Sequence, residues 1–253
     1  MKPLLLLATL VALAVPASAS ARVERTAAPQ AAPPPLRLQS SCVRRAERGR
    51  VVRFNAADGI RLIGVELGKG PRGLVLSHGY HQSVCDWIGQ ARRLARAGYR
   101  VLVFDHRNHG SSTYTRKRPW RIDQDVVGAV RTIRARGAKS VVLAGSSMGG
   151  TAVLAGAAAL RLGVDGVVSL SAPAHFSVVD AQAAVGRLAV PTLFVAAEGD
   201  DPFDDDARTL FAASAAREKR LEMIPASDAH GTGLLRFASV RALFDEFLRS
   251  HST

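Results

Sequence analysis

The sequence lacks a long hydrophobic run at its start. Residues 4–15 are apolar but fall short of the roughly 20 residues that span a bilayer. Lys2 puts positive charge before this stretch, and small residues follow it at 16–19, as signal peptidase requires. We therefore predict a secretory signal peptide over residues 1–21, cleaved after Ala19 or Ala21, and a secreted or cell-envelope location. An uncleaved membrane anchor is the alternative. No cysteine ends the segment, which argues against lipid attachment.

Cysteine is scarce, with only Cys42 and Cys85 in the chain. In an exported protein an even number suggests a disulfide, and two unpaired thiols are the alternative. The scarcity also limits metal binding. Two histidine pairs have H-x-x-H spacing but no cysteine or acidic partner that would complete a zinc site, namely His78/His81 and His106/His109. We expect neither a metal nor a cofactor.

Acidic residues are few beside the basic ones. The chain has 21 Asp and Glu against 34 Lys and Arg, which gives a formal net charge of +13. Such a charge favours anionic surfaces, including a cell envelope. The arginines are nevertheless scattered rather than gathered with aromatic residues, and no nucleic-acid-binding motif is present. A basic surface without a specific partner is therefore the preferred interpretation, an envelope surface is the alternative, and no specific nucleic acid is expected.

Residues 22–42 contain little that a core could bury. They are rich in alanine and proline, which predicts a flexible or polyproline-like spacer. Residues 43–253 are expected to form one domain, since the chain is 47% hydrophobic and this length suits one large core. We find no internal repeat and no second domain.

Strand and helix patterns alternate along this domain. A hairpin is predicted first, and the later strands are separated by helices, which is typical of a mainly parallel sheet covered on both faces. Strands are predicted over residues 51–55, 62–67, 73–77, 99–104, 140–144, 166–170, 192–197 and 220–224. Helices are predicted over residues 86–97, 122–134, 150–162, 204–216 and 234–248. In such an α/β fold the site lies beyond the carboxyl ends of the strands.

One motif follows the carboxyl end of the strand predicted at residues 140–144. Residues 145–149 read Gly-Ser-Ser-Met-Gly, a G-x-S-x-G pattern between a β-branched apolar strand and an alanine-rich helix. A serine on this sharp turn projects its hydroxyl clear of the backbone, and the flanking glycines let strand and helix approach. The setting predicts a nucleophile elbow with Ser147 as the nucleophile.

A serine hydroxyl needs a base, and the base needs an orienting carboxylate. The expected chain order is serine, acid, histidine. His230 follows the last predicted strand and supplies the base. Asp200 follows the preceding strand; we prefer it to its neighbour Asp201, and both to Glu198.

The tetrahedral intermediate of acyl transfer needs hydrogen-bond donors for its oxyanion. The backbone N–H of Met148, just after the nucleophile, is one candidate. The second is expected in the loop after the third strand, where Gly79 permits a bend and Tyr80 N–H is the candidate donor. His78 is interpreted as a structural loop residue.

With these motifs, the chain resembles the α/β-hydrolase superfamily, especially its serine esterase and monoacylglycerol-lipase-like members. The resemblance covers about residues 50–250. It includes the stretch Asp105-His-Arg-Asn-His-Gly-Ser-Ser112, which is similar to a D-x-R-x-x-G-x-S loop that is mainly structural in the family, so His106 and His109 receive no catalytic role. One departure is Ala197, where the family often has glycine.

Family members often insert a cap before the acid-bearing strand. Here only residues 174–190 separate the two strands, which leaves room for one short helix near 178–188 and no cap domain. The pocket is expected to be open. Its expected border consists of Tyr80, His175, Phe176 and Phe203.

The sequence therefore predicts an exported serine hydrolase of the carboxylesterase type, acting on a small or medium ester, thioester or amide through an acyl-enzyme on Ser147. An acyltransferase of the same fold and a non-catalytic ligand- or envelope-binding relative are the alternatives. Dehalogenase and epoxide hydrolase activities are disfavoured, because the resemblance associates them with aspartate at the elbow.

Overall fold

The computed structural model describes residues 33–115, 119–160 and 163–252. By their contacts, all helices and strands belong to one compact unit, Pro35–Thr253; of the preceding unit, Met1–Pro34, only the last two residues are described. The predicted signal peptide thus lies outside the described residues. Residues 35–42, assigned to the spacer by sequence, lie within the compact unit. In the described part of the chain, no helix has the length and apolarity to cross a membrane.

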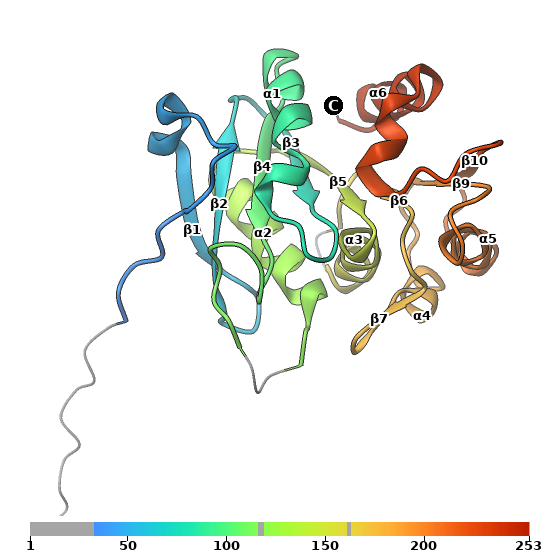
Figure 1. The fold of residues 1–253 in the computed structure, drawn as a ribbon, viewed down its shortest axis with the longest axis horizontal. Coiled ribbons are helices and arrows are strands. Elements are labelled where there is room, and N and C mark those ends of the chain that lie inside the picture. Colours follow the sequence, from blue (N-terminus) through green and yellow to red (C-terminus); the bar gives the residue numbers. More distant parts are fainter. Residues whose placement is uncertain (1–32, 116–118, 161–162, 253) are drawn as a thin grey trace, which may run out of the picture. The chain divides into compact units, whose positions relative to one another are not determined.

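An eight-stranded sheet forms the centre of the unit (Figure 1). Its strands are β1 (Val51–Asn55), β2 (Arg61–Leu67), β3 (Arg72–Ser77), β4 (Arg100–Asp105), β5 (Ser140–Ser146), β6 (Gly166–Leu170), β9 (Thr192–Ala197) and β10 (Lys219–Ile224). The spatial order is β1-β2-β4-β3-β5-β6-β9-β10. Strand β2 pairs antiparallel with β1 and β4, and every other pairing is parallel. This topology confirms the predicted leading hairpin and mainly parallel sheet.

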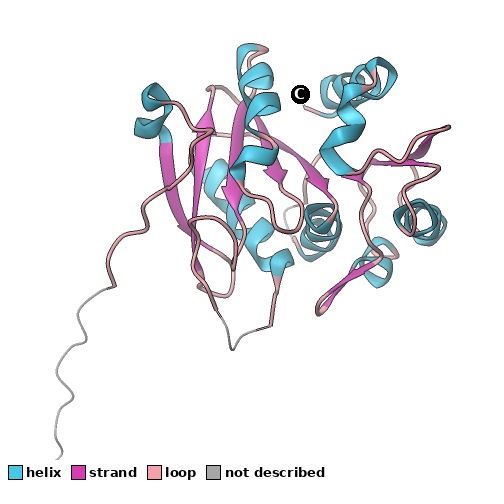
Figure 2. Cartoon of the chain, viewed as in Figure 1, coloured by secondary structure: helices cyan, strands magenta, loops and turns pink. Residues whose placement is uncertain are grey.

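Helices cover both faces of this sheet (Figure 2). One core packs α2 (Ile122–Ala135), α3 (Met148–Ala159), α4 (Ala181–Val185) and α5 (Phe203–Ala213) against the sheet; the other packs α1 (Ile88–Arg96) and α6 (Ala238–His251). Side chains alternate between the two faces of the sheet along β5, which explains why there are two cores. Val141 and Leu143 enter the first core, whereas Val142 and Ala144 enter the second. Both faces are therefore apolar, and the strands carry chemistry only at their ends.

The helices predicted at 150–162 and 204–216 end three residues early, at Ala159 and Ala213, and two other predicted helices differ more from the structure. Residues 178–188 do not form one helix: β7 (His175–Phe176) and β8 (Val179–Asp180) pair as a small hairpin, and Asp180 caps the short α4 by accepting from Ala183 N at 2.8 Å. The last helix begins at Ala238 rather than 234, because Phe237 is extended and a 3-10 turn, η3 (Gly231–Arg236), precedes it. The connection from β6 to β9 holds no cap domain in its described residues.

Cys42 and Cys85 form a disulfide. Cys85 lies in the 3-10 turn η2 (Val84–Asp86), directly after the loop that follows β3. The bond therefore joins the segment before the first turn, η1 (Arg45–Arg50), to the carboxyl end of the sheet. The suggested pairing is confirmed, and the alternative of two unpaired thiols is wrong.

Candidate active site

Ser147 lies between β5 and α3 in a backbone conformation that L-residues rarely adopt, with φ 52° and ψ −124°. Close packing on both sides holds it there. A Cβ on Gly145 would lie 2.1 Å from the carbonyl oxygen of Gly149, and a Cβ on Gly149 would lie 2.2 Å from that of Ser77. Only glycine fits at either position, so the predicted elbow is present with the sharp turn that its sequence indicated.

His230 and Asp200 are directly bonded. His230 Nδ1 lies 2.9 Å and 3.0 Å from the two carboxylate oxygens of Asp200. Asp200 is buried at 7% exposure, whereas Asp201 and Glu198 are exposed. The geometry thus selects Asp200 among the three predicted acids. Since Nδ1 donates to the carboxylate, the neutral ring has its lone pair on Nε2, the nitrogen that a general base uses.

Burial and neighbouring groups shift the pKa of Asp200, and an aromatic ring packs on His230. Burial raises the pKa of Asp200, although hydrogen bonds from Ser171 and His230 and the charge of His230 oppose the shift. The ring of Phe203 lies 4.4 Å from the His230 ring, centroid to centroid. The predicted border residue Phe203 therefore packs against the candidate base.

The loop that bears His230 is fastened to the elbow. Gly231 N donates to Ser171 Oγ at 3.0 Å, and Thr232 N donates to Ser146 Oγ at 3.2 Å. A Cβ on Gly231, whose φ is +55°, would lie 2.3 Å from Ser146 Oγ and 3.9 Å from Ser147 N. The loop that bears His230 thus packs against the elbow, although within the described residues the side chains of His230 and Ser147 make no direct hydrogen bond. Catalytic hydrogen bonds often tighten only when substrate binds.

Ser171 and Ser146 bond the loop that bears His230, and the sequence analysis missed both. Ser171 is fully buried at the carboxyl end of β6, with φ +51°. Its hydroxyl accepts from Gly231 N at 3.0 Å, and its interaction with the Asp200 carboxylate lowers the pKa of that group, so it lies between the acid loop and the base loop. The available signal was its place directly after a predicted strand, where functional residues gather in parallel sheets.

Both predicted oxyanion donors lie beside Ser147 in the chain or in space. Met148 is the first residue of α3, so its N–H has no partner within the helix. Gly79 packs against the candidate nucleophile, since a Cβ on it would lie 3.4 Å from Ser147 Cβ. The peptide bond between Gly79 and Tyr80 carries both Gly79 C=O and the candidate donor Tyr80 N–H.

His78 orients the peptide bond between Gly79 and Tyr80. Its Nε2 accepts from His106 N at 3.0 Å, so its Nδ1 carries the proton and donates to Gly79 O at 2.7 Å. In a planar trans peptide the C=O and the following N–H point in opposite directions, so Tyr80 N–H points away from the buried ring. Burial lowers the pKa of His78 well below its usual range, with His106 and His109 adding to the effect. The structural interpretation of His78 thus becomes specific: a neutral histidine orients the candidate donor.

Hydrogen bonds and ion pairs join the loop after β4 to residues of the surrounding fold. Arg107 is fully buried and donates to Asp58 at 2.7 and 2.8 Å and to Asp125 at 2.8 Å. His106 bonds Ser77 Oγ at 2.7 Å and Asp125 at 3.1 Å. These contacts fit the structural role that the resemblance implies. Among the described residues, no three His, Cys, Asp or Glu side chains are grouped so as to hold a metal ion.

An aromatic cluster borders the candidate oxyanion loop. The Tyr80 ring, 42% exposed, lies 5.4 Å from Phe176, 5.7 Å from His109 and 6.0 Å from Trp120, centroid to centroid. Trp120 precedes α2 and was missed by the sequence analysis. His175, a predicted border residue, is exposed and pairs with Asp180 across the β7–β8 hairpin. We call Tyr80, His109, Trp120 and Phe176 the aromatic cluster.

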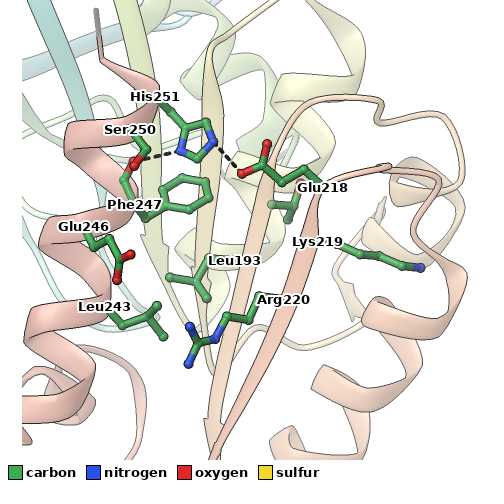
Figure 3. Close-up of a pocket in the computed structure, with 10 residues that line it drawn as sticks. Leu193, Glu218, Lys219, Arg220, Leu243, Glu246, Phe247, Ser250 and His251 are labelled. Atoms are coloured by element: carbon green, nitrogen blue, oxygen red, sulfur yellow. Dashed lines mark hydrogen bonds and ion pairs between the residues drawn. The ribbon is translucent and has the colours of Figure 1, made fainter.

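A cavity of about 170 Å³ lies elsewhere, between α6 and strands β9 and β10 (Figure 3). Its wall includes Thr192 and Lys219, the first residues of their strands, and His251, which bonds Glu218 at 2.9 Å. Ser147 follows the last residue of β5, and these strands run parallel. The cavity and the elbow therefore lie at opposite ends of the sheet.

The fold and the elbow match a known family. A family model described as the alpha/beta hydrolase fold matches residues 74–188, from β3 past α4. The chain therefore has the α/β-hydrolase fold. The matched segment contains the candidate oxyanion loop, the elbow and the hairpin, whereas Asp200 and His230 lie beyond it.

Similar proteins include epoxide hydrolases and esterases. The chain is 47% identical over 55 residues to bifunctional epoxide hydrolase 2 of Mus musculus (22% of this chain, 10% of that protein). It is 36% identical over 77 residues to epoxide hydrolase B of Mycobacterium tuberculosis (30% of this chain, 22% of that protein). The chain thus spans less than a quarter of the length of either relative. A Pyrococcus furiosus esterase shares the fold, with a TM-score of 0.64 and 16% identity over 80% of this chain and 91% of that chain.

Proposed function

We propose that this protein is a serine hydrolase that cleaves carboxylic esters through an acyl-enzyme on Ser147. The observation that carries the proposal is the bonded pair of Asp200 and His230, held by Ser171 and Ser146 against the elbow. A buried carboxylate that fixes Nδ1–H leaves Nε2 free to take a proton.

The proposed reaction has two halves. Ser147 Oγ attacks the ester carbonyl while His230 Nε2 takes its proton, and the N–H groups of Met148 and Tyr80 receive the oxyanion. His230 then returns the proton to the departing alcohol. A water molecule, activated in the same way, releases the acid and restores Ser147. In an acyltransferase, which remains the alternative, a bound alcohol would replace that water.

The elbow residue separates ester from epoxide chemistry. Although two of the relatives are named epoxide hydrolases, residue 147 is serine and not the aspartate that the resemblance associates with that activity. A serine with a histidine base suits attack on a carbonyl. We therefore keep the carboxylic ester as the substrate, with thioesters and amides as chemical variants.

The aromatic cluster supports an ester with an apolar group. Its rings flank the oxyanion loop, and burial lowers the pKa of His109, which leaves that ring neutral at pH 7. A neutral aromatic wall favours flat or apolar groups over charged ones. We therefore propose a small or medium, uncharged acyl group as the group that contacts the aromatic cluster.

The disulfide supports an extracytoplasmic location, because such bonds persist in oxidising compartments. With the predicted signal at residues 1–21, we propose export, and the net charge of +13 is consistent with retention at an anionic envelope. Sequencing the amino terminus of the exported protein checks this proposal, since cleavage after Ala19 or Ala21 is expected.

Hydrolysis of p-nitrophenyl acetate by the wild type and by Ser147→Ala tests the activity. Loss of the nucleophile is expected to reduce kcat by roughly 10⁴-fold or more. Ser239→Ala, which changes an exposed serine of α6, is the matched control and is expected to keep the wild-type rate. A fluorophosphonate should label the wild type and the control but not Ser147→Ala. Equal hydrolysis by all three proteins would contradict the proposal.

A further inference from the structure

We propose that Asp86 is a positioning residue that holds the oxyanion loop and the histidine loop in one arrangement. This inference rests on the proposed function. Asp86 Oδ2 accepts from Gly79 N at 3.1 Å, and Asp86 Oδ1 accepts from Thr232 Oγ1 at 2.6 Å. One carboxylate therefore bonds the residue before the Tyr80 donor and the residue two places after His230. We call these two bonds the Asp86 clamp.

The clamp connects parts that the sheet does not connect directly. Gly79 follows β3, while Thr232 follows β10 at the far edge of the sheet. Thr232 is also bonded through its backbone to Ser146 beside the nucleophile. Asp86 thus completes a chain of contacts from the oxyanion loop, through the histidine loop, to the elbow. The relative placement of the two loops and the elbow decides whether the base, the nucleophile and the oxyanion donors can all act on one substrate carbonyl group.

Asp86 is itself held in place. It ends the turn η2, which Ser83 caps: Ser83 Oγ accepts from Cys85 N at 3.3 Å, and Ser83 O accepts from Asp86 N at 3.0 Å. The neighbouring Cys85 is bonded to Cys42. On the other side, the fully buried Trp87 donates its Nε1–H to Ser77 O at 2.9 Å. A side chain carried on such a turn is suited to positioning others, because its own backbone has little freedom.

The hydroxyl of Thr232 offers a precise way to open the clamp. Thr232→Val removes one bond while it keeps the shape and leaves the Thr232 N bond to Ser146 intact. Thr232→Ser keeps the hydroxyl. Asp86→Ala removes both bonds, and Asp86→Asn leaves a single acceptor oxygen where two are used. Asp245→Ala is the matched acidic control, because Asp245 lies in α6 and pairs with Arg93 outside both loops.

Kinetics on p-nitrophenyl acetate with the oxidised full-length variants test the proposal. Thr232→Val and Asp86→Ala are expected to lower kcat by roughly 10- to 100-fold with KM within about threefold of the wild type, as for a small displacement of reacting groups. Asp86→Asn should be intermediate, while Thr232→Ser and Asp245→Ala should retain the wild-type kcat. Wild-type kcat in both Thr232→Val and Asp86→Ala would overturn the clamp, as would an equal loss in Thr232→Ser.

Hydrogen exchange provides a readout that does not depend on turnover. Thr232→Val is expected to speed amide exchange in residues 78–82, a loop that contains no part of the substitution, while Thr232→Ser leaves it slow. Unchanged exchange in Thr232→Val would overturn the proposal. If wild type and Ser147→Ala hydrolyse the ester equally, the proposed function fails, yet the exchange measurement still decides whether Asp86 couples the two loops.

Discussion

A Cβ atom on Gly145 would lie 2.1 Å from the carbonyl oxygen of Gly149. The two glycines of the elbow thus touch each other's backbone, and neither the end of β5 nor the start of α3 has space to move. The conformation of Ser147 depends on this contact, since nothing in a serine side chain favours φ 52°.

Gly145→Ala is accordingly expected to destabilise the fold by about 3 kcal/mol, because the new methyl group meets backbone and not a flexible side chain. Gly89→Ala is the matched control: within α1 a Cβ at position 89 meets nothing within 4 Å, so the change should stabilise the protein by about 0.5–1 kcal/mol. Urea denaturation measures both. Similar effects of the same sign would refute the packing argument.

Asp200→Asn is expected to separate activity from stability. Since burial raises the pKa of Asp200, the folded state binds a proton more tightly than the unfolded state, and its contribution to stability falls as pH rises through the folded pKa. The neutral amide removes that cost, so the variant should melt at pH 7 no lower than the wild type, while kcat falls about 10⁴-fold.

Asp201→Asn is the control for this substitution. Asp201 is exposed, so both the melting temperature and kcat should remain near wild type. A large loss of kcat in Asp201→Asn, with Asp200→Asn active, would show that the wrong carboxylate has been assigned to His230. Thermal melting and ester hydrolysis at pH 7 measure the two properties.

Glu47 should make stability depend on pH at the acid end. Hydrogen bonding to Arg92 lowers the pKa of Glu47 to about 2 from an ordinary value of 4.5. A lowered carboxyl pKa contributes stability above 4.5 that is lost as pH falls toward 2. Glu47→Gln should therefore cost about 1 kcal/mol at pH 7 and almost nothing near pH 2, measured by denaturation at both values. A constant difference would contradict the ion-pair origin.

Removal of the disulfide should lower stability substantially. Cys42 and Cys85 are 43 residues apart, so the bond limits the unfolded chain, and Cys42→Ser with Cys85→Ser is expected to cost about 2–4 kcal/mol. Reduction of the wild type should reproduce the change, and the double variant should no longer respond to reductant. If reductant destabilises both proteins equally, the effect has another origin.

Trp120→Ala should change substrate preference. The aromatic cluster would lose a ring that contacts Tyr80 and Phe176, so kcat/KM for p-nitrophenyl benzoate should fall about tenfold relative to p-nitrophenyl acetate. Tyr114→Ala, which removes a 64% exposed ring, should leave the ratio unchanged. An unaltered ratio in Trp120→Ala would exclude the cluster from acyl recognition.

The elements could be predicted because their signals are local. The strands Gly166–Leu170 and Thr192–Ala197 have the predicted bounds, since apolar runs closed by glycine, proline or acidic turns need no distant information. The short helix predicted near 178–188 is present but covers only Ala181–Val185, because Ser177, with φ 54°, and the cap Asp180 divide that segment into hairpin and helix. A single sequence does not reveal which of several polar residues turns the chain.

By itself, the sequence determined the elbow at Ser147, the chain order of the candidate nucleophile, acid and base, and the parallel sheet that brings these residues to the carboxyl ends of its strands. These follow from short motifs and from hydrophobic period, which are local properties. The tertiary structure alone decided that Asp200 rather than Asp201 bonds His230, and that Ser171, Ser146 and Asp86 hold the loops together. Adjacent turn residues point in different directions, and contacts such as Asp86 with Thr232, 146 positions apart, form only when the sheet brings its strand ends together.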